Sequence, residues 1–130
     1  MAKVHRGSCL CGAVSFEISG DLPQPVACHG TNCRKFTGHF EVSIDVPDAR
    51  LSVRGDESVK WFQPSEKTRR RFCCRCGSSS FFDPIHHDWI GISMGAFDCP
   101  TGTTVAMHIY VADKGDYYQI ADGLPQKRQQ

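Results

Sequence analysis

Hydrophobic and polar residues alternate at a period of two along several short stretches of the chain. No window of about ten residues has the 3.6-residue period of a long amphipathic helix. Alternation at period two places every second side chain on one face, as in a strand with one buried side. The clearest predicted strands are 14–18, 42–46, 90–94 and 107–111, with weaker ones at 51–53, 59–62, 79–82 and 117–120. One short helix is predicted at 31–37.

Turn-forming pairs of glycine, proline and aspartate stand between these stretches, and no linker or repeat divides the chain. The pattern therefore predicts a mainly β fold in a single domain over 1–130, a length that suits one core. Trp61 and Trp89 stand in apolar stretches and are expected in that core. Residues 126–130 are polar and are expected to be frayed.

Charge is nearly balanced, with a formal net charge of +1, and this excludes the basic surface of a dedicated nucleic-acid or membrane binder. The one dense basic run, Lys67 with Arg69–Arg71, is predicted to be a solvated strand face, with anion recognition as the alternative. No membrane span or secretory signal is found, so a cytoplasmic location is expected. In a reducing compartment, clustered cysteines are more often metal ligands or redox groups than disulfides.

The chain has eight cysteines, more than a domain of this size needs in order to fold. Two close pairs, Cys9-x-Cys11 and Cys73-x-x-Cys76, are each followed by a glycine. Together they offer four thiolates, the ligand set that a structural zinc prefers, and glycine permits the tight turn that each pair needs. The alternative is a set of buried or disulfide-bonded structural cysteines.

A second constellation surrounds Cys28 and Cys33, beside His29 and the basic residues Arg34 and Lys35. Two thiolates with open coordination positions suit a catalytic rather than a structural metal. Because two protein ligands are few for zinc, a pair of free cysteines beside a turn is an equal alternative. His29 is a candidate third ligand, although adjacent residues on extended backbone point apart.

The other histidines and cysteines are assigned structural positions. His86 and His87 are expected in a solvated turn, with metal binding as the alternative, and His108 on a strand face. Cys74 is expected to be a bystander inside the second close pair, and Cys99 a loop thiol. The sequence identifies no general base.

With these motifs in this order, the chain resembles the glutathione-dependent formaldehyde-activating enzyme (Gfa) family, also called the centromere-protein-V-like family. The similarity covers nearly the whole chain. The segments that carry it are Gly7–Val14, Cys28-His29, Cys33–Lys35 with Gly38, Arg71–Cys73, Cys76–Ser78, Gly95–Asp98, His108–Tyr110 and Ile120–Pro125.

The resemblance implies a single β-rich domain of the Mss4-like, β-tent type. It also implies that one zinc is structural and is held by Cys9, Cys11, Cys73 and Cys76. The family holds a second zinc with a Cys-x-Cys-x-x-Cys motif, which falls on Cys28, position 30 and Cys33. Position 30 is Gly30, so this second site lacks one ligand.

The function implied is that of a zinc-dependent carbon–sulfur lyase acting on a thiol–aldehyde adduct, such as glutathione with formaldehyde giving S-hydroxymethylglutathione. The partner expected is a small thiol, not a nucleic acid or a membrane. An alternative from a different class is a zinc-stapled binding module whose second metal site has degenerated at Gly30.

Overall fold

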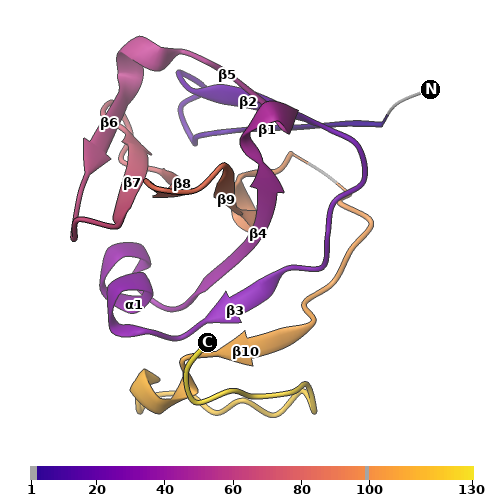
Figure 1. Ribbon diagram of the computed structural model, residues 1–130, viewed down its shortest axis with the longest axis vertical. Helices are drawn as coiled ribbons and strands as arrows, with labels where there is room; N and C mark the ends of the chain where they lie inside the picture. The colour runs from indigo at the N-terminus through magenta and orange to yellow at the C-terminus, as the bar shows by residue number, and fades with distance from the viewer. Residues whose placement is uncertain (1–2, 99) are drawn as a thin grey trace.

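The computed structural model describes residues 3–98 and 100–130. The described residues form ten strands, one α-helix and four short 3-10 turns, drawn in Figure 1. The strands are β1 Val4–Ser8, β2 Ser15–Ser19, β3 Val26–Cys28, β4 Glu41–Pro47, β5 Leu51–Arg54, β6 Val59–Phe62, β7 Thr68–Cys73, β8 Ser79–Pro84, β9 Trp89–Ser93 and β10 Met107–Ile109. The helix is α1 Thr31–Thr37, and the 3-10 turns are Asp48–Arg50, Asp56–Ser58, Met94–Ala96 and Val111–Asp113. No helix among the described residues is long and apolar enough to cross a membrane.

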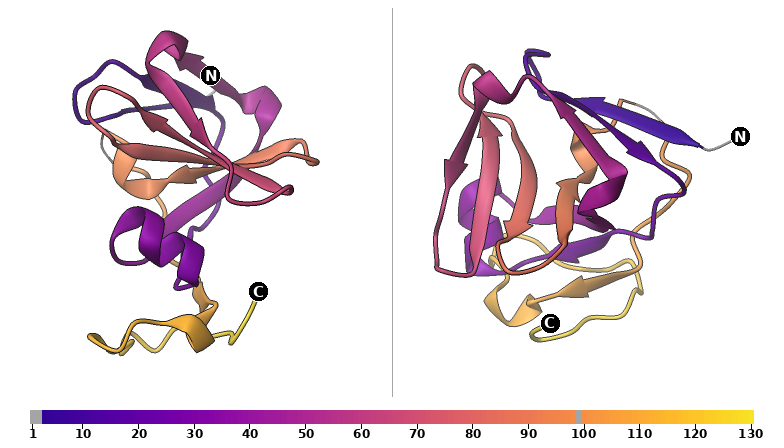
Figure 2. Two further views of the ribbon diagram at one scale, coloured as in Figure 1. Left: turned by 90° about the vertical axis from the view of Figure 1, so that its left-hand side faces the viewer. Right: turned by 45° about the horizontal axis from the view of Figure 1, so that its top comes forward.

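The strands form two sheets. One has three strands in the order β1-β2-β5, and the other has seven in the order β10-β3-β4-β9-β8-β7-β6. Neighbouring strands are antiparallel, except that β10 pairs with β3 in parallel. In Figure 2, the smaller sheet covers one side of the larger one, and the C-terminal segment lies beyond α1. This arrangement confirms the predicted mainly β fold.

The hydrophobic core lies between the two sheets. Phe16 and Ile18 of β2 pack with residues of the larger sheet, among them Phe81 of β8 and the isoleucines and valine of β4 and β9. The Phe16 and Phe81 rings meet edge to face, with centroids 5.4 Å apart. The alternation along 14–18, 42–46 and 90–94 therefore indicates the buried faces correctly, because every second side chain enters this core.

The other face of the larger sheet carries α1. Alternate side chains of β7 face opposite sides, so Arg70 and Phe72 face the helix whereas Cys73 joins the core. Phe36 of α1 packs against the Phe72 ring, with centroids 6.4 Å apart. The helix ends at Gly38, whose φ of 93° is left-handed. Packing rather than intrinsic propensity holds a helix of seven residues.

Most of the predicted elements are present. Strands β2, β4, β5, β6, β8 and β9 lie where the alternation predicts them, and α1 spans the predicted 31–37. The fourth strong prediction, 107–111, is shorter in the structure, where β10 ends at Ile109. The prediction of a strand at 117–120 is wrong, because this segment contributes side chains to a buried network instead of pairing with a sheet.

Three strands lack a clear alternation of apolar and polar residues in the sequence. β1 contains little apolar surface, and β3 is only three residues long. Strand β7 coincides with the basic run, which confirms the strand predicted there although its charges hide the alternation. The prediction that this strand face is solvated is wrong at Arg70, which is 4% exposed.

Two further expectations differ from the structure. Trp61 is 40% exposed rather than in the core, and the guanidinium groups of Arg69 and Arg71 lie over its ring at 3.9 and 4.1 Å. The C-terminal residues, expected to be frayed, run beside β10 in Figure 1. There Lys127 N–H donates to the His108 carbonyl at 2.9 Å, and the Gln129 carbonyl accepts from Tyr110 N–H at 2.9 Å.

Candidate metal centre and thiol site

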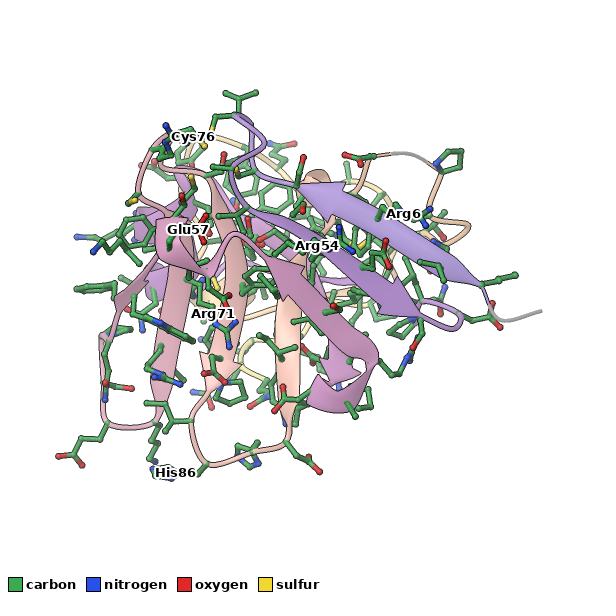
Figure 3. The ribbon with its side chains drawn as sticks, turned by 90° about the horizontal axis from the view of Figure 1, so that it is seen from above. Arg6, Arg54, Glu57, Arg71, Cys76 and His86 are labelled. Carbon is green, nitrogen blue, oxygen red and sulfur yellow. The ribbon has the colours of Figure 1, made fainter. Side chains whose placement is uncertain are left out.

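Two turns far apart in the sequence bring four cysteines together. Cys9 and Cys11 follow β1, whereas Cys73 and Cys76 lie at the end of β7 and in the turn after it. Their four sulfur atoms all lie within 4.8 Å of one another. Figure 3 shows Cys76 at a corner of the molecule, where these turns meet. The two close pairs predicted from their spacing therefore form one cluster that can hold a metal ion.

The backbone of each turn supports the sulfur atoms. In the first turn the Val14 N–H donates to Cys9 Sγ at 3.3 Å, and in the second the Arg75 N–H donates to Cys73 Sγ at 3.4 Å. Gly12 and Gly77 close these turns at φ values of 82° and 80°, which favour glycine. Amide donors stabilise sulfur in its thiolate form, the form that binds metal.

Ser78 joins the two turns. Its hydroxyl accepts a hydrogen bond from Leu10 N–H at 3.0 Å and lies 3.2 Å from Cys76 Sγ. The hydrogen bond with Ser78 lowers the pKa of the Cys76 thiol to about 5. The chemistry and spacing of the donors fit a metal with four thiolate ligands. Because the protein fills every tetrahedral position, such a metal would be structural rather than catalytic.

Cys28 and Cys33 form a second, smaller thiol site. Cys28 ends β3, and Cys33 lies in the first turn of α1. Both are partly exposed and line a cavity of about 420 Å³ whose wall also includes Lys67 and Arg70. A small molecule can therefore reach both sulfur atoms.

Arg70 makes the two thiols unequal. Its Nη2 donates to Cys33 Sγ at 3.3 Å, and its guanidinium lies over the Phe36 and Phe82 rings at 5.1 and 5.0 Å. The hydrogen bond from the Cys28 thiol, with the hydrogen bond and charge of Arg70, lowers the pKa of Cys33 to about 6. The same contact with Cys33, together with burial, raises the pKa of Cys28. The pair is therefore a thiolate at Cys33 and a thiol at Cys28.

Glu41 is a buried carboxyl close to this pair, and the sequence analysis does not identify it. It is the strand partner of Cys28, is 8% exposed and accepts a hydrogen bond from the Ser93 hydroxyl at 2.6 Å. Burial raises its pKa, and Arg70 opposes this shift. Glu41 also lines a larger cavity of about 770 Å³, whose walls include Phe36 and Cys9. A lone glutamate at the start of a strand carries no sequence signal for such a position.

The geometry around Gly30 tests whether Cys28 and Cys33 form a second metal centre. A Cβ atom at Gly30 would lie 3.5 Å from Cys28 Sγ, so a third cysteine there would stand beside the pair. With glycine, the pair has two protein sulfurs, and within 3–98 and 100–130 the four-cysteine cluster is the one group of three or more candidate ligands. The residues present do not fit a three-cysteine metal centre.

His29, the candidate third ligand, is hydrogen-bonded in a separate buried network. It is completely buried, with Nε2 2.9 Å from His108 Nδ1 and Nδ1 in contact with the Tyr118 hydroxyl. His108 Nε2 in turn lies 2.8 Å from a carboxylate oxygen of Asp122. In one consistent assignment, the Tyr118 hydroxyl donates to His29 Nδ1, His29 Nε2–H donates to His108 Nδ1, and His108 Nε2–H donates to Asp122. Both ring nitrogens of His29 are therefore engaged in hydrogen bonds.

This network holds the C-terminal segment against the Cys28–Cys33 loop. Burial, followed by the adjacent imidazole of His108, lowers the pKa of His29 to about 4, so its neutral form predominates at pH 7. Tyr110 adopts a left-handed φ of 56° beyond β10. Its Cβ would lie 3.4 Å from a Cβ at Gly30, and its side chain lines the thiol cavity. The segment thus forms part of the cavity wall.

The other candidate residues are not among the ligands of the four-cysteine cluster. His86 and His87 are in the turn between β8 and β9, and Cys74 is exposed in the turn between Cys73 and Cys76. Cys99 lies outside the described residues. The strand position predicted for His108 is confirmed, and its part in the hydrogen-bonded network is an addition to that prediction.

Comparisons with known proteins agree with this arrangement. The model of the glutathione-dependent formaldehyde-activating enzyme family matches residues 4–113. A Halomonas elongata protein whose provisional name is glutathione-dependent formaldehyde-activating enzyme is 28% identical over 125 residues, which cover 88% of this chain and 80% of that protein. An uncharacterized lyase of Schizosaccharomyces pombe is 24% identical over 119 residues, covering 91% of this chain and 86% of that protein.

One solved structure shares the fold. The crystal structure of a Rhodobacter sphaeroides protein superposes with a TM-score of 0.58 at 19% identity, covering 94% of this chain and 98% of that one. At this identity the similarity shows the fold alone. It supports the arrangement of two sheets described above.

Proposed function

The chain belongs to the glutathione-dependent formaldehyde-activating enzyme family, and on that premise we propose that it catalyses the reversible addition of a small thiol to an aldehyde. With glutathione and formaldehyde the product is S-hydroxymethylglutathione, and the reverse reaction is a carbon–sulfur lyase reaction. The lyase name of one relative supports this class. The observation that carries the proposal is the Arg70 guanidinium 3.3 Å from a cysteine sulfur on the wall of an open cavity.

The chemistry needs a stabilised thiolate and a donor for the developing oxyanion. The sulfur attacks the carbonyl carbon, the carbon–sulfur bond forms, and the carbonyl electron pair moves to oxygen, which takes up a proton. Lys67 and Arg70 provide positive charge at the cavity wall, which favours a thiolate in the substrate. Ser65, Thr68 and Tyr110 line the same wall and carry hydroxyl donors for the oxygen.

We assign zinc to the four-cysteine cluster as its structural metal. Zn²⁺ is favoured by four thiolates in a tetrahedron, and when bound it would staple the turn after β1 to the turn after β7. No catalytic step is assigned to a second metal at Cys28 and Cys33, because the pair supplies only two of the three sulfurs that the family's motif offers. A reducing compartment such as the cytoplasm would keep these two cysteines as free thiols rather than a disulfide, and we place the protein there.

The test is an assay of free thiol. Protein is mixed with glutathione and formaldehyde, and the loss of free thiol is followed against the uncatalysed rate, with Cys28→Ala and Cys33→Ala as active-site variants and Cys74→Ala as the matched control. We expect acceleration by the wild type and by Cys74→Ala only. An uncatalysed rate with glutathione and with several other small thiols would overturn the proposal.

Gly30 favours one alternative, a zinc-stapled binding module that uses the cavity without turnover. Calorimetric titration with glutathione separates the two functions. Binding of glutathione without any acceleration of the addition would support the binding module.

A further inference from the structure

We propose that Cys28 and Cys33 form a redox-active dithiol that reduces the disulfide of a low-molecular-weight thiol and becomes an intramolecular disulfide. This activity goes beyond thiol addition to an aldehyde, because it changes the oxidation state of the protein. It uses the same cavity and needs neither an aldehyde nor a bound metal.

The local fold brings the two sulfur atoms to one cavity. Cys28 ends β3 and Cys33 lies in the first turn of α1, so the backbone turns between them, and both thiols line the same cavity. The third sulfur that would divert them to a metal is absent at Gly30, and both nitrogens of His29 are engaged with Tyr118 and His108. The pair is therefore free to react as thiols.

The two thiols of the pair lie in unequal environments. Thiol–disulfide exchange needs one thiolate to attack and a second thiol to resolve the mixed disulfide. Arg70 donates to Cys33 and not to Cys28, and it is held by the rings of Phe36 and Phe82. Cys33 is therefore the attacking residue and Cys28 the resolving one.

Access and charge at the cavity favour an anionic disulfide as the substrate. The cavity of about 420 Å³ opens onto both sulfurs, and its wall carries two cationic residues, Lys67 and Arg70, against one acidic residue, Asp113. A disulfide whose halves carry carboxylates suits this wall better than a neutral one does. By contrast, two of the four sulfurs in the four-cysteine cluster, those of Cys9 and Cys73, are buried.

The exchange balances in two steps. The Cys33 thiolate attacks one sulfur of the substrate R–S–S–R, a Cys33–S–R bond forms, the substrate S–S bond breaks, and R–S⁻ leaves. This leaving thiolate takes the proton of the Cys28 thiol. The Cys28 thiolate then attacks Cys33 Sγ and expels the second R–S⁻, which is protonated by water. The dithiol loses two electrons and the substrate disulfide gains them.

The test uses the purified full-length protein with its metal bound, and oxidised glutathione as the probe. Wild type, Cys28→Ser, Cys33→Ser and the control Cys74→Ser are incubated with the probe, quenched with acid, and analysed by intact mass and peptide mapping. We expect a Cys28–Cys33 disulfide without retained glutathione in wild type and in Cys74→Ser. Cys28→Ser should instead retain one glutathione on Cys33, and Cys33→Ser should react at position 28 at least tenfold more slowly.

Two outcomes would overturn the proposal. One is retention of glutathione by Cys28→Ser only at Cys74 or Cys99, and the other is equal reaction rates at Cys28 and Cys33 in the two single variants. Circular dichroism and metal content, measured on each variant, show whether the fold is retained. A failure of the thiol–aldehyde addition leaves these masses unchanged, so the outcome of this experiment is distinguishable from that of the proposed function.

Discussion

Strand β7 contributes a residue to each of the two cysteine sites, from opposite faces of the strand. On one face of β7, Cys73 joins three other sulfurs beside the core, where backbone amides and Ser78 surround them. On the other face, Arg70 reaches a pair of sulfurs that has no third member and opens onto a cavity. The two groups of cysteines therefore differ in the number of neighbouring sulfurs and in their access to solvent.

The difference shows what removal of each group should do. A saturated four-thiolate site has no open position for substrate, so its loss should affect the fold. The Cys28–Cys33 pair lines a cavity beside Arg70, so its loss should affect chemistry more than the fold. The experiments below test this contrast, beginning with the largest expected effect.

The first experiment removes the metal. Cys73→Ser, or a strong chelator during unfolding, should lower the metal content from one ion per chain to none. It should lower the free energy of unfolding by more than about 4 kcal/mol, the range seen when a structural metal is lost. Metal analysis and thermal unfolding measure both effects. Cys74→Ser, at the exposed neighbouring position, is the control, and equal destabilisation by both variants would contradict the assignment.

The second experiment removes the pair. Cys28→Ser and Cys33→Ser should each slow the thiol–aldehyde addition by at least about 10²-fold, the effect of losing an organised polar group at a reaction centre. Each should keep the metal and change the free energy of unfolding by less than about 1 kcal/mol. Initial rates and denaturant unfolding provide the measurements. A variant that unfolds like Cys73→Ser would remove the contrast between the two groups.

The third experiment breaks the polar network behind the pair. His108→Gln leaves the buried His29 Nε2 without its partner, so we expect a loss of about 1–3 kcal/mol in the free energy of unfolding. The four-cysteine metal should remain bound. Equilibrium unfolding with metal analysis tests this, and Asp122→Asn, at the exposed end of the network, should have a smaller effect.

The fourth experiment uses pH. His29 has a folded pKa of about 4, lowered by burial and then by His108, His39 and Lys114, with Asp122 opposing the shift. Because the unfolded imidazole titrates near 6.5, the unfolded state binds the proton first, and stability falls as pH decreases from about 6.5 to 4. Between pH 7 and pH 6, this protonation should lower the free energy of unfolding by about 1 kcal/mol or less. An NMR titration of His29 with a midpoint near 6.5 would contradict it.

The fifth experiment adds a third cysteine to the Cys28–Cys33 pair. Gly30 has φ −65° and ψ 160°, which any residue adopts, so Gly30→Cys should change the free energy of unfolding by less than about 1 kcal/mol. Its thiol would stand beside Cys28, and the zinc content should rise from one to two per chain. Gly30→Ser is the matched control and should still bind one. A content of one zinc in Gly30→Cys would show that these residues do not assemble a second site.

Part of the fold follows directly from local pattern. Alternation predicts β2, β4 and β9, because half-buried strands repeat apolar side chains at period two. It does not predict β7, because arginines occupy both of its faces and Arg70 is buried through a partner distant in sequence. It predicts a strand at 117–120 incorrectly, because Tyr118 turns to His29 instead of pairing in a sheet.

The sequence by itself determined the mainly β fold and the two close cysteine pairs, because alternation, spacing and turn glycines are local properties. Its resemblance to the family predicted that Gly30 stands where the family's motif has a cysteine. Only the tertiary structure decided that Arg70 and Glu41 stand near Cys33 and that His29 is occupied by Tyr118 and His108. These contacts join residues brought together by sheet order and chain reversal, and such distances are not encoded in any short stretch of sequence.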